Sequence, residues 1–160
     1  MSALYVSPFN DDIVGVPNDG RIYRLIRPDW VDWDDNTQRG GGPHIRKVAF
    51  QDYKEEDAKE MGYEGPCMSV ALGRLLIELG DDPAALPQLT TKSHYGVAWL
   101  NVAEVRSLPQ GSQGLQARPE PRIPWHGIVF CLTRPKKNDS IQRGLAAIAE
   151  WVVLPQKVSG

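Results

Sequence analysis

The run of residues 125–132 constrains the fold most, because it is short, apolar, rich in β-branched residues and flanked by prolines. Such a run favours a buried strand. Further strands are predicted at 21–26, where polar and apolar residues alternate, and at 95–100, which is largely apolar. A short strand is predicted at 47–50, and a closing strand at 152–154 ahead of a proline.

Two main helices are predicted. The first has apolar residues at a spacing near 3.6 and is ended by Gly80; these residues are Met68, Leu72, Leu75, Leu76 and Leu79. The second begins with Asp139 as its cap and has an apolar face formed by Ile141, Leu145, Ile148 and Val152. Asn101 and Glu104 form a capping-box pattern that predicts a short helix over 102–108.

These elements alternate without a regular βαβ rhythm, which favours an α+β fold in which two main helices pack on a mixed β-sheet. The 160 residues have the ordinary size of one domain, so we expect a single domain over 1–160. Residues 1–20 are predicted to form an irregular arm that ends in a turn. Long loops are predicted at 36–43, which contains three glycines, and at 109–124.

The composition excludes several classes of protein. A net charge of −2 without a basic stripe argues against a nucleic-acid partner. The sequence has no apolar stretch near the ~18 residues of a membrane span and no secretory signal pattern, so we expect no membrane contact. Two cysteines without metal-ligand spacing indicate a reduced, cytoplasmic protein with no metal site and no cofactor.

The sharpest catalytic hypothesis pairs Cys67 with His126. Cys67 follows Gly65 and Pro66 and is expected at a helix N-terminus, where orphan amides and the helix dipole lower the pKa of a thiol. His126 opens the predicted strand and would act as the base. This order and placement are similar to those of papain-like cysteine hydrolases.

A second hypothesis is an NAD-binding domain similar to ADP-ribosyltransferases. Such folds carry an arginine or histidine on the first strand, and Arg24 fits that position. They also need a later acidic residue, for which Glu104 and Glu150 are the candidates.

Our leading expectation is a binding or accessory module that acts through contact with another protein. Trp30 and Trp33 lie close together beside three aspartates, and paired indoles of this kind form platforms for partners. The two long predicted loops would extend that binding surface.

Short segments spread over most of the chain resemble a group of small bacterial proteins to which no activity is assigned. The matching segments are Tyr23-Arg24-Leu25-Ile26-Arg27-Pro28-Asp29, Ala49-Phe50, Ser69-Val70, Trp125-His126-Gly127 and Leu145-Ala146-Ala147-Ile148-Ala149-Glu150-Trp151-Val152-Val153. In that group, hydroxyl residues tend to precede Ala49-Phe50, where this chain has Arg46 and Lys47. The resemblance implies a bacterial source and a shared fold.

Overall fold

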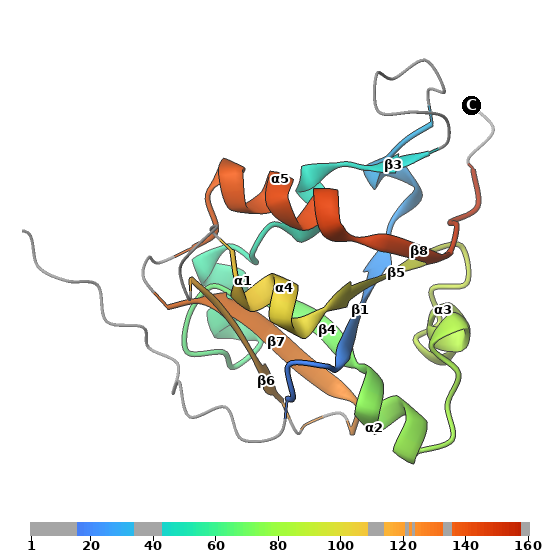
Figure 1. Cartoon of the computed structure of the whole chain (residues 1–160), viewed down its shortest axis with the longest axis horizontal. Coiled ribbons are helices and arrows are strands. Elements are labelled where there is room, and N and C mark those ends of the chain that lie inside the picture. Colours follow the sequence, from blue (N-terminus) through green and yellow to red (C-terminus); the bar gives the residue numbers. More distant parts are fainter. Residues whose placement is uncertain are drawn as a thin grey trace, which may run out of the picture.

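A six-stranded antiparallel sheet forms the centre of the computed structural model, which describes residues 16–33, 43–108, 114–120, 122, 124–132 and 136–157. The strand order is β6-β7-β4-β1-β5-β8 (Figure 1), and each pair of neighbours is antiparallel. The strands of this sheet are β1 (Arg21–Ile26), β4 (Met68–Leu72), β5 (Gly96–Asn101), β6 (Leu115–Pro119), β7 (His126–Cys131) and β8 (Glu150–Val153). A separate hairpin consists of β2 (Val31–Asp32) and β3 (His44–Ile45).

The helices are short, apart from the last one. The α-helices are α1 (Glu55–Glu60), α2 (Gly73–Glu78), α3 (Leu86–Leu89), α4 (Val102–Arg106) and α5 (Asp139–Ile148), and the 3-10 helices are η1 (Pro28–Trp30), η2 (Lys47–Phe50) and η3 (Pro83–Ala85). The α+β class is therefore confirmed, and the sheet that we expected to be mixed has antiparallel pairing in every described ladder. None of the described helices has the length and apolar character needed to cross a bilayer.

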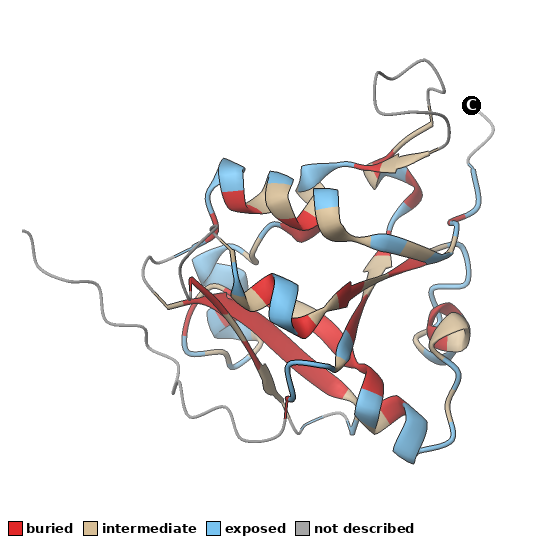
Figure 2. Ribbon diagram, in the orientation of Figure 1, coloured by how far each residue is buried: buried red, intermediate tan, exposed pale blue. Residues whose placement is uncertain are grey.

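The sheet buries residues on both of its faces. On one face, Met68, Val70 and Leu72 of β4 pack with Ile141 and Leu145 of α5 in the main core. On the other face, smaller clusters form around Tyr23, Leu76 and Leu86 and around Cys67, Ile128 and Phe130. Every residue of β7 is buried, as Figure 2 shows, which confirms that 125–132 contains a central buried strand.

The predicted helix that starts at Met68 is wrong over its first turn and a half. Residues 68–72 form β4 between β1 and β7, and only Gly73–Glu78 is helical. Ile77 and Leu79 are 72% and 52% exposed, so the leucine spacing does not produce a single buried face. The alternation of small or polar residues at 67, 69 and 71 with Met68, Val70 and Leu72 is the strand pattern that decides this segment.

Three further expectations need correction. Residues 47–50 form the 3-10 helix η2 instead of a strand, and the predicted loop 109–124 contains strand β6, which pairs with β7. The cap of α5 is Asn138, whose side chain accepts a hydrogen bond from the Ile141 amide, one residue before the predicted Asp139. The predicted arm and the loop 36–43 lie outside the described residues, except for 16–20 and Pro43.

Several other elements occur where they were predicted, with different ends. The last helix stops at Ile148, so Val152, which we expected on its apolar face, lies in β8 instead. Strands occupy Arg21–Ile26 and Gly96–Asn101, and β8 closes the sheet at Glu150–Val153. Helix α4 follows Asn101, whose side chain accepts from the Glu104 amide as a capping box requires.

Candidate functional site

The hairpin of β6 and β7 places His126 beside an acidic residue. Pro119 pairs with Gly127, and the Glu120 amide donates to the His126 carbonyl at 2.8 Å, so the connection between the two strands begins and ends at these residues. Both side chains are largely buried, at 8% and 13% exposed for His126 and Glu120.

Three side chains form a continuous chain of hydrogen bonds across two strands and this connection. His126 Nδ1 lies 3.0 Å from Glu120 Oε2, and His126 Nε2 lies 2.9 Å from Ser69 Oγ. Ala71 of β4 pairs with His126 of β7, and Ser69 points to the same face of β4 as Ala71, so antiparallel pairing brings the hydroxyl to the imidazole. We call Ser69, His126 and Glu120 the serine relay.

The hydrogen-bond acceptors in the serine relay determine which of its atoms carry a proton. An ionised carboxylate only accepts, so the Nδ1 atom of a neutral His126 carries the proton and donates to Glu120. Nε2 is then an acceptor, and the Ser69 hydroxyl donates to it. This tautomer leaves the imidazole ready to take a proton from Ser69 Oγ.

The charge of Glu120 is favoured by its neighbours. Burial alone would raise the pKa of this carboxyl, but hydrogen bonds from His126 and Arg122 outweigh burial and hold the pKa below its ordinary value. Arg122 Nε lies 2.5 Å from Glu120 Oε1. The carboxylate is therefore ionised at neutral pH.

Two further side chains hold Ser69. The Tyr53 hydroxyl lies 3.1 Å from Ser69 Oγ. Arg24 Nη1 donates to the Ser69 carbonyl at 2.8 Å, and Arg24 Nε donates to the Ala49 carbonyl at 3.0 Å. Burial lowers the pKa of the Arg24 guanidinium from its ordinary value.

Arg24 occupies the place where β1 and β4 separate. The β1–β4 ladder contains only the pairs of Ile22 with Leu72 and of Tyr23 with Ala71. It therefore does not extend along β4 as far as Ser69. The guanidinium supplies the hydrogen bond that a strand would otherwise give to the Ser69 carbonyl. Asp29, which is near in sequence, pairs with Arg27.

The serine relay opens into a cavity of about 390 Å³ on the face of the sheet away from α5. Ser69, His126, Tyr53 and Arg24 all line this cavity, which we call the serine cavity. Its remaining lining residues are aromatic, aliphatic, basic or hydroxyl side chains: Tyr23, Leu25, Arg27, Trp30, Val70, Ala71, Leu86, Thr90, Lys92, Tyr95 and Trp125.

Cys67 does not have the surroundings that we predicted for a nucleophile. It precedes strand β4 and not a helix, is fully buried, and packs with Ile128 and Phe130. Burial, with a contribution from Asp52, raises the pKa of its thiol to about 12, opposite to the lowering that a nucleophile needs. His126, which we predicted as its base, has both ring nitrogens engaged by Ser69 and Glu120.

The other predicted site residues are divided between two places. Trp30 lines the serine cavity, with the Arg24 and Arg27 guanidinium groups 5.5 and 5.4 Å from its ring. Trp33 donates from Nε1 to the Pro28 carbonyl at 3.3 Å. Both indoles are half-buried and pack against the main core, so they do not form the exposed platform that we expected.

The acidic residues proposed to partner Arg24 lie elsewhere. Glu104 is exposed in the first turn of α4, and Glu150 is exposed at the start of β8. Neither residue lines the serine cavity. The carboxylate that does reach the site, Glu120, lies in the segment that we expected to be loop.

Sequence reasoning missed Ser69, Glu120 and Tyr53. The available signal for Ser69 was its position two residues after Cys67 in a strand-like alternation, which puts both residues on one face. Glu120 and Tyr53 carry no local signal, because only tertiary contacts bring their segments to His126 and Ser69.

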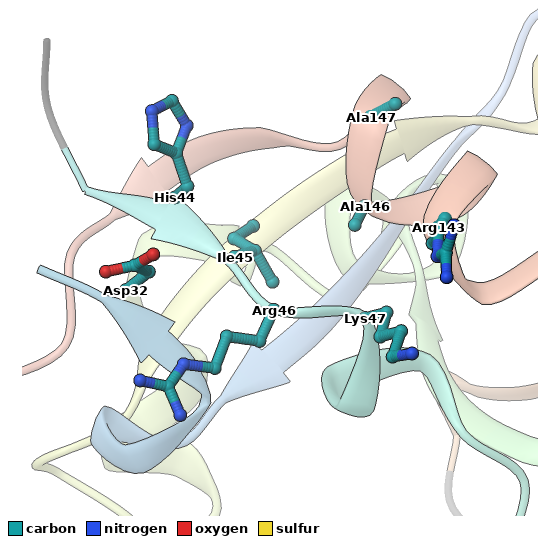
Figure 3. A pocket seen from close by; sticks show the side chains of 8 residues that line it. All are labelled: Asp32, His44, Ile45, Arg46, Lys47, Arg143, Ala146 and Ala147. Carbon is teal, nitrogen blue, oxygen red and sulfur yellow. The ribbon is translucent and has the colours of Figure 1, made fainter. Parts of the chain in front are cut away.

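A second cavity, of about 470 Å³, lies between β3, η2 and α5 (Figure 3). Its cationic residues Lys47 and Arg143 both pair with Asp139, and Arg46 extends away from them. These are exposed ion pairs, which contribute little to the free energy of folding. They also hold no proton in position for transfer to a substrate. We therefore take the serine cavity as the candidate site.

The described residues contain no group of three or more His, Cys, Asp or Glu side chains that would hold a metal ion. Compared with known proteins, the chain matches no protein family, no curated sequence and no solved structure.

Proposed function

We propose that the protein is a serine hydrolase that cleaves a small ester or a related acyl compound in the serine cavity. The observation that carries this proposal is the unbroken chain from Glu120 through His126 to the Ser69 hydroxyl, with distances of 3.0 and 2.9 Å. Carboxylate, imidazole and hydroxyl in this order are the groups that activate a serine nucleophile.

The proposed reaction has two halves. Ser69 Oγ attacks the acyl carbon and passes its proton to His126 Nε2, while Glu120 balances the imidazolium. His126 then gives that proton to the departing alkoxide, which leaves an acyl ester on Ser69. Water, deprotonated by His126, then attacks this ester, and His126 returns the proton to Ser69 Oγ as the acid leaves.

The negative charge that develops on the acyl oxygen needs donors beside Ser69. Arg24 and Tyr53 are the candidate donors, because both contact Ser69; the Tyr53 hydroxyl, which now donates to Ser69 Oγ, would turn to the acyl oxygen as its charge develops. Both side chains line the serine cavity.

The direct test is the rate of p-nitrophenyl acetate and butyrate hydrolysis by the protein and its variants. We expect Ser69→Ala and His126→Gln to reduce the rate to that of the uncatalysed reaction. Ser140→Ala serves as the matched control, because Ser140 is an exposed serine on α5. Near-UV circular dichroism checks that each variant is folded. A folded Ser69→Ala variant with the activity of the parent protein would refute the proposal.

A second candidate function is that of a binding module that contacts another protein. For either function, we propose that the protein works in the bacterial cytoplasm. The exposed apolar residues Ile77 and Leu79 at the end of α2 favour it, at 72% and 52% exposed. The test is affinity capture from a bacterial lysate with the parent protein and with the Ile77→Ser, Leu79→Ser variant. Partners retained equally by both proteins would exclude this surface.

A further inference from the structure

The loop that follows α3 is held in one defined conformation at the rim of the serine cavity. The Lys92 amide donates to the Pro87 carbonyl at 2.7 Å, and the Thr91 amide donates to the Gln88 carbonyl at 3.3 Å. These two bonds form a Schellman motif, which closes the C-terminus of a helix.

Thr91 occupies the position of this motif that glycine usually takes. Its φ is 57°, and it is the one residue other than glycine with a positive φ in the described part of the chain. A β-branched residue in the left-handed region is strained, and such strain persists where the surrounding structure holds it. The next residue after this turn, Lys92, lines the cavity.

Lys92 brings a charge that nearby acidic residues do not balance. Its ammonium lies 5.4 Å from the centre of the Tyr95 ring, and none of the described carboxylates forms an ion pair with it. The described lining of the serine cavity contains no Asp or Glu. Asp29 and Asp52, which adjoin lining residues along the chain, pair with Arg27 and Lys137.

The cavity that Lys92 lines also has aromatic walls. Tyr95, Trp125 and Trp30 line the same cavity as Ser69 and Lys92. Flat aromatic walls favour an apolar part of a ligand, and an unbalanced ammonium favours an anionic group. A neutral aliphatic ligand would use only one of these features.

We infer that the serine cavity takes a small acyl compound that carries an anionic oxygen group, a carboxylate or a phosphate, which Lys92 binds. This inference names the substrate class of the proposed hydrolase and rests on that function for the acyl part. The anionic group and the charge of Lys92 are tested separately from catalysis.

The kinetic test compares a neutral ester with an anionic one of similar length, p-nitrophenyl butyrate and mono-p-nitrophenyl glutarate. We expect the ratio of kcat/KM to favour the anionic ester and to fall about tenfold in Lys92→Gln, as for loss of one hydrogen bond to a charged group. Lys136→Gln, an exposed lysine away from the serine cavity, is the matched control and should keep the ratio of the parent protein.

The binding test uses the Ser69→Ala variant, which cannot form an acyl ester at residue 69. Tryptophan fluorescence follows titration with phenyl phosphate, with benzoate and with benzyl alcohol as the neutral probe. We expect the anionic probes to bind more tightly, and Lys92→Gln to weaken them about tenfold. The order of the two anions identifies phosphate or carboxylate as the preferred group.

The two tests separate the two proposals. Charge-selective binding that depends on Lys92, without ester hydrolysis by the parent protein, would retain the ligand class and refute the hydrolase. Equal binding of neutral and anionic probes, no binding of any probe, or an unchanged Lys92→Gln variant would overturn the inference.

Discussion

Cys67, immediately before β4, and Ser69, in β4, lie on the same side of the sheet but have opposite chemical surroundings. Cys67 is enclosed by Ile128 and Phe130, whereas Ser69 contacts His126 and Tyr53 and opens into the serine cavity. A step of two positions along the chain therefore leads from an unreactive thiol to a hydroxyl that is hydrogen-bonded to an imidazole.

The Cys67 thiol should react slowly in the folded protein. Its pKa of about 12 keeps it protonated at neutral pH, and burial blocks access. We expect iodoacetamide to modify Cys67 far more slowly than a free thiol, and the rate to stay low when the pH is raised from 7 to 9. Mass spectrometry of the protein in urea, where modification should be complete, is the control. Rapid modification of Cys67 in the native protein would contradict this account.

The raised pKa of Cys67 also links stability to pH. The unfolded thiol ionises near its ordinary value of 9.0 and the folded thiol near 12, so the stabilisation is complete below pH 9 and is lost as the pH rises toward 12. We expect urea denaturation of Cys67→Ala to show a smaller loss of stability between pH 8 and pH 10 than the parent protein. Parallel losses would argue that other groups carry the dependence.

Glu120 is expected to act through its charge. Replacing it with glutamine keeps the shape but removes the carboxylate that balances the His126 imidazolium, so ester hydrolysis should fall by roughly 10²- to 10⁴-fold in kcat. Glu64→Gln is the matched control, because Glu64 also pairs with an arginine, Arg118, but is not part of the serine relay. Unchanged kcat in a folded Glu120→Gln variant would remove Glu120 from the mechanism.

At the scale of elements, a buried ion pair fastens the segment before α1 to the start of α5. The Lys137 ammonium pairs with Asp52, its amide donates to Asp52 Oδ2 at 2.8 Å, and the two side chains are 0% and 3% exposed. Asp52→Asn leaves a buried ammonium without its counter-charge, so unfolding in urea should show a loss of about 3–5 kcal/mol. Asp139→Asn, which breaks two exposed pairs, should cost much less, and equal losses would contradict this account.

The end of α3 stores a small amount of backbone strain. Thr91→Gly relieves the left-handed conformation, and after the entropy cost of glycine it should raise the free energy of unfolding by about 0.5–1 kcal/mol. Thr90→Gly is the adjacent control, since its φ of −104° is ordinary and its hydroxyl donates to the Leu86 carbonyl. Urea denaturation should show opposite signs for the two variants.

At the scale of the whole molecule, local patterns predicted most of the sheet. Alternation and apolar runs located β1, β5 and β7, and a capping box located α4. Segment 68–72 was misjudged because Met68 and Leu72 are compatible with a helix as well as a strand. Its pairing with β1 and β7 is a tertiary effect that decides between them.

The candidate site was only partly predictable for the same reason. His126 and Arg24 were found because each lies on a recognisable strand, and both line the serine cavity. Ser69 lies 57 residues from His126, and the two are joined only by the antiparallel register of β4 and β7. Reactive side chains that are brought together only by strand pairing have no characteristic spacing in the sequence.

The most direct test of the central claim is labelling of the folded protein with a fluorophosphonate, which phosphonylates an activated serine and releases fluoride. Peptide mass spectrometry should place the adduct on Ser69, while the exposed serines Ser93, Ser107 and Ser140 in the same sample remain unmodified. No adduct on Ser69, or labelling of Ser69 no faster than of these exposed serines, would contradict the account.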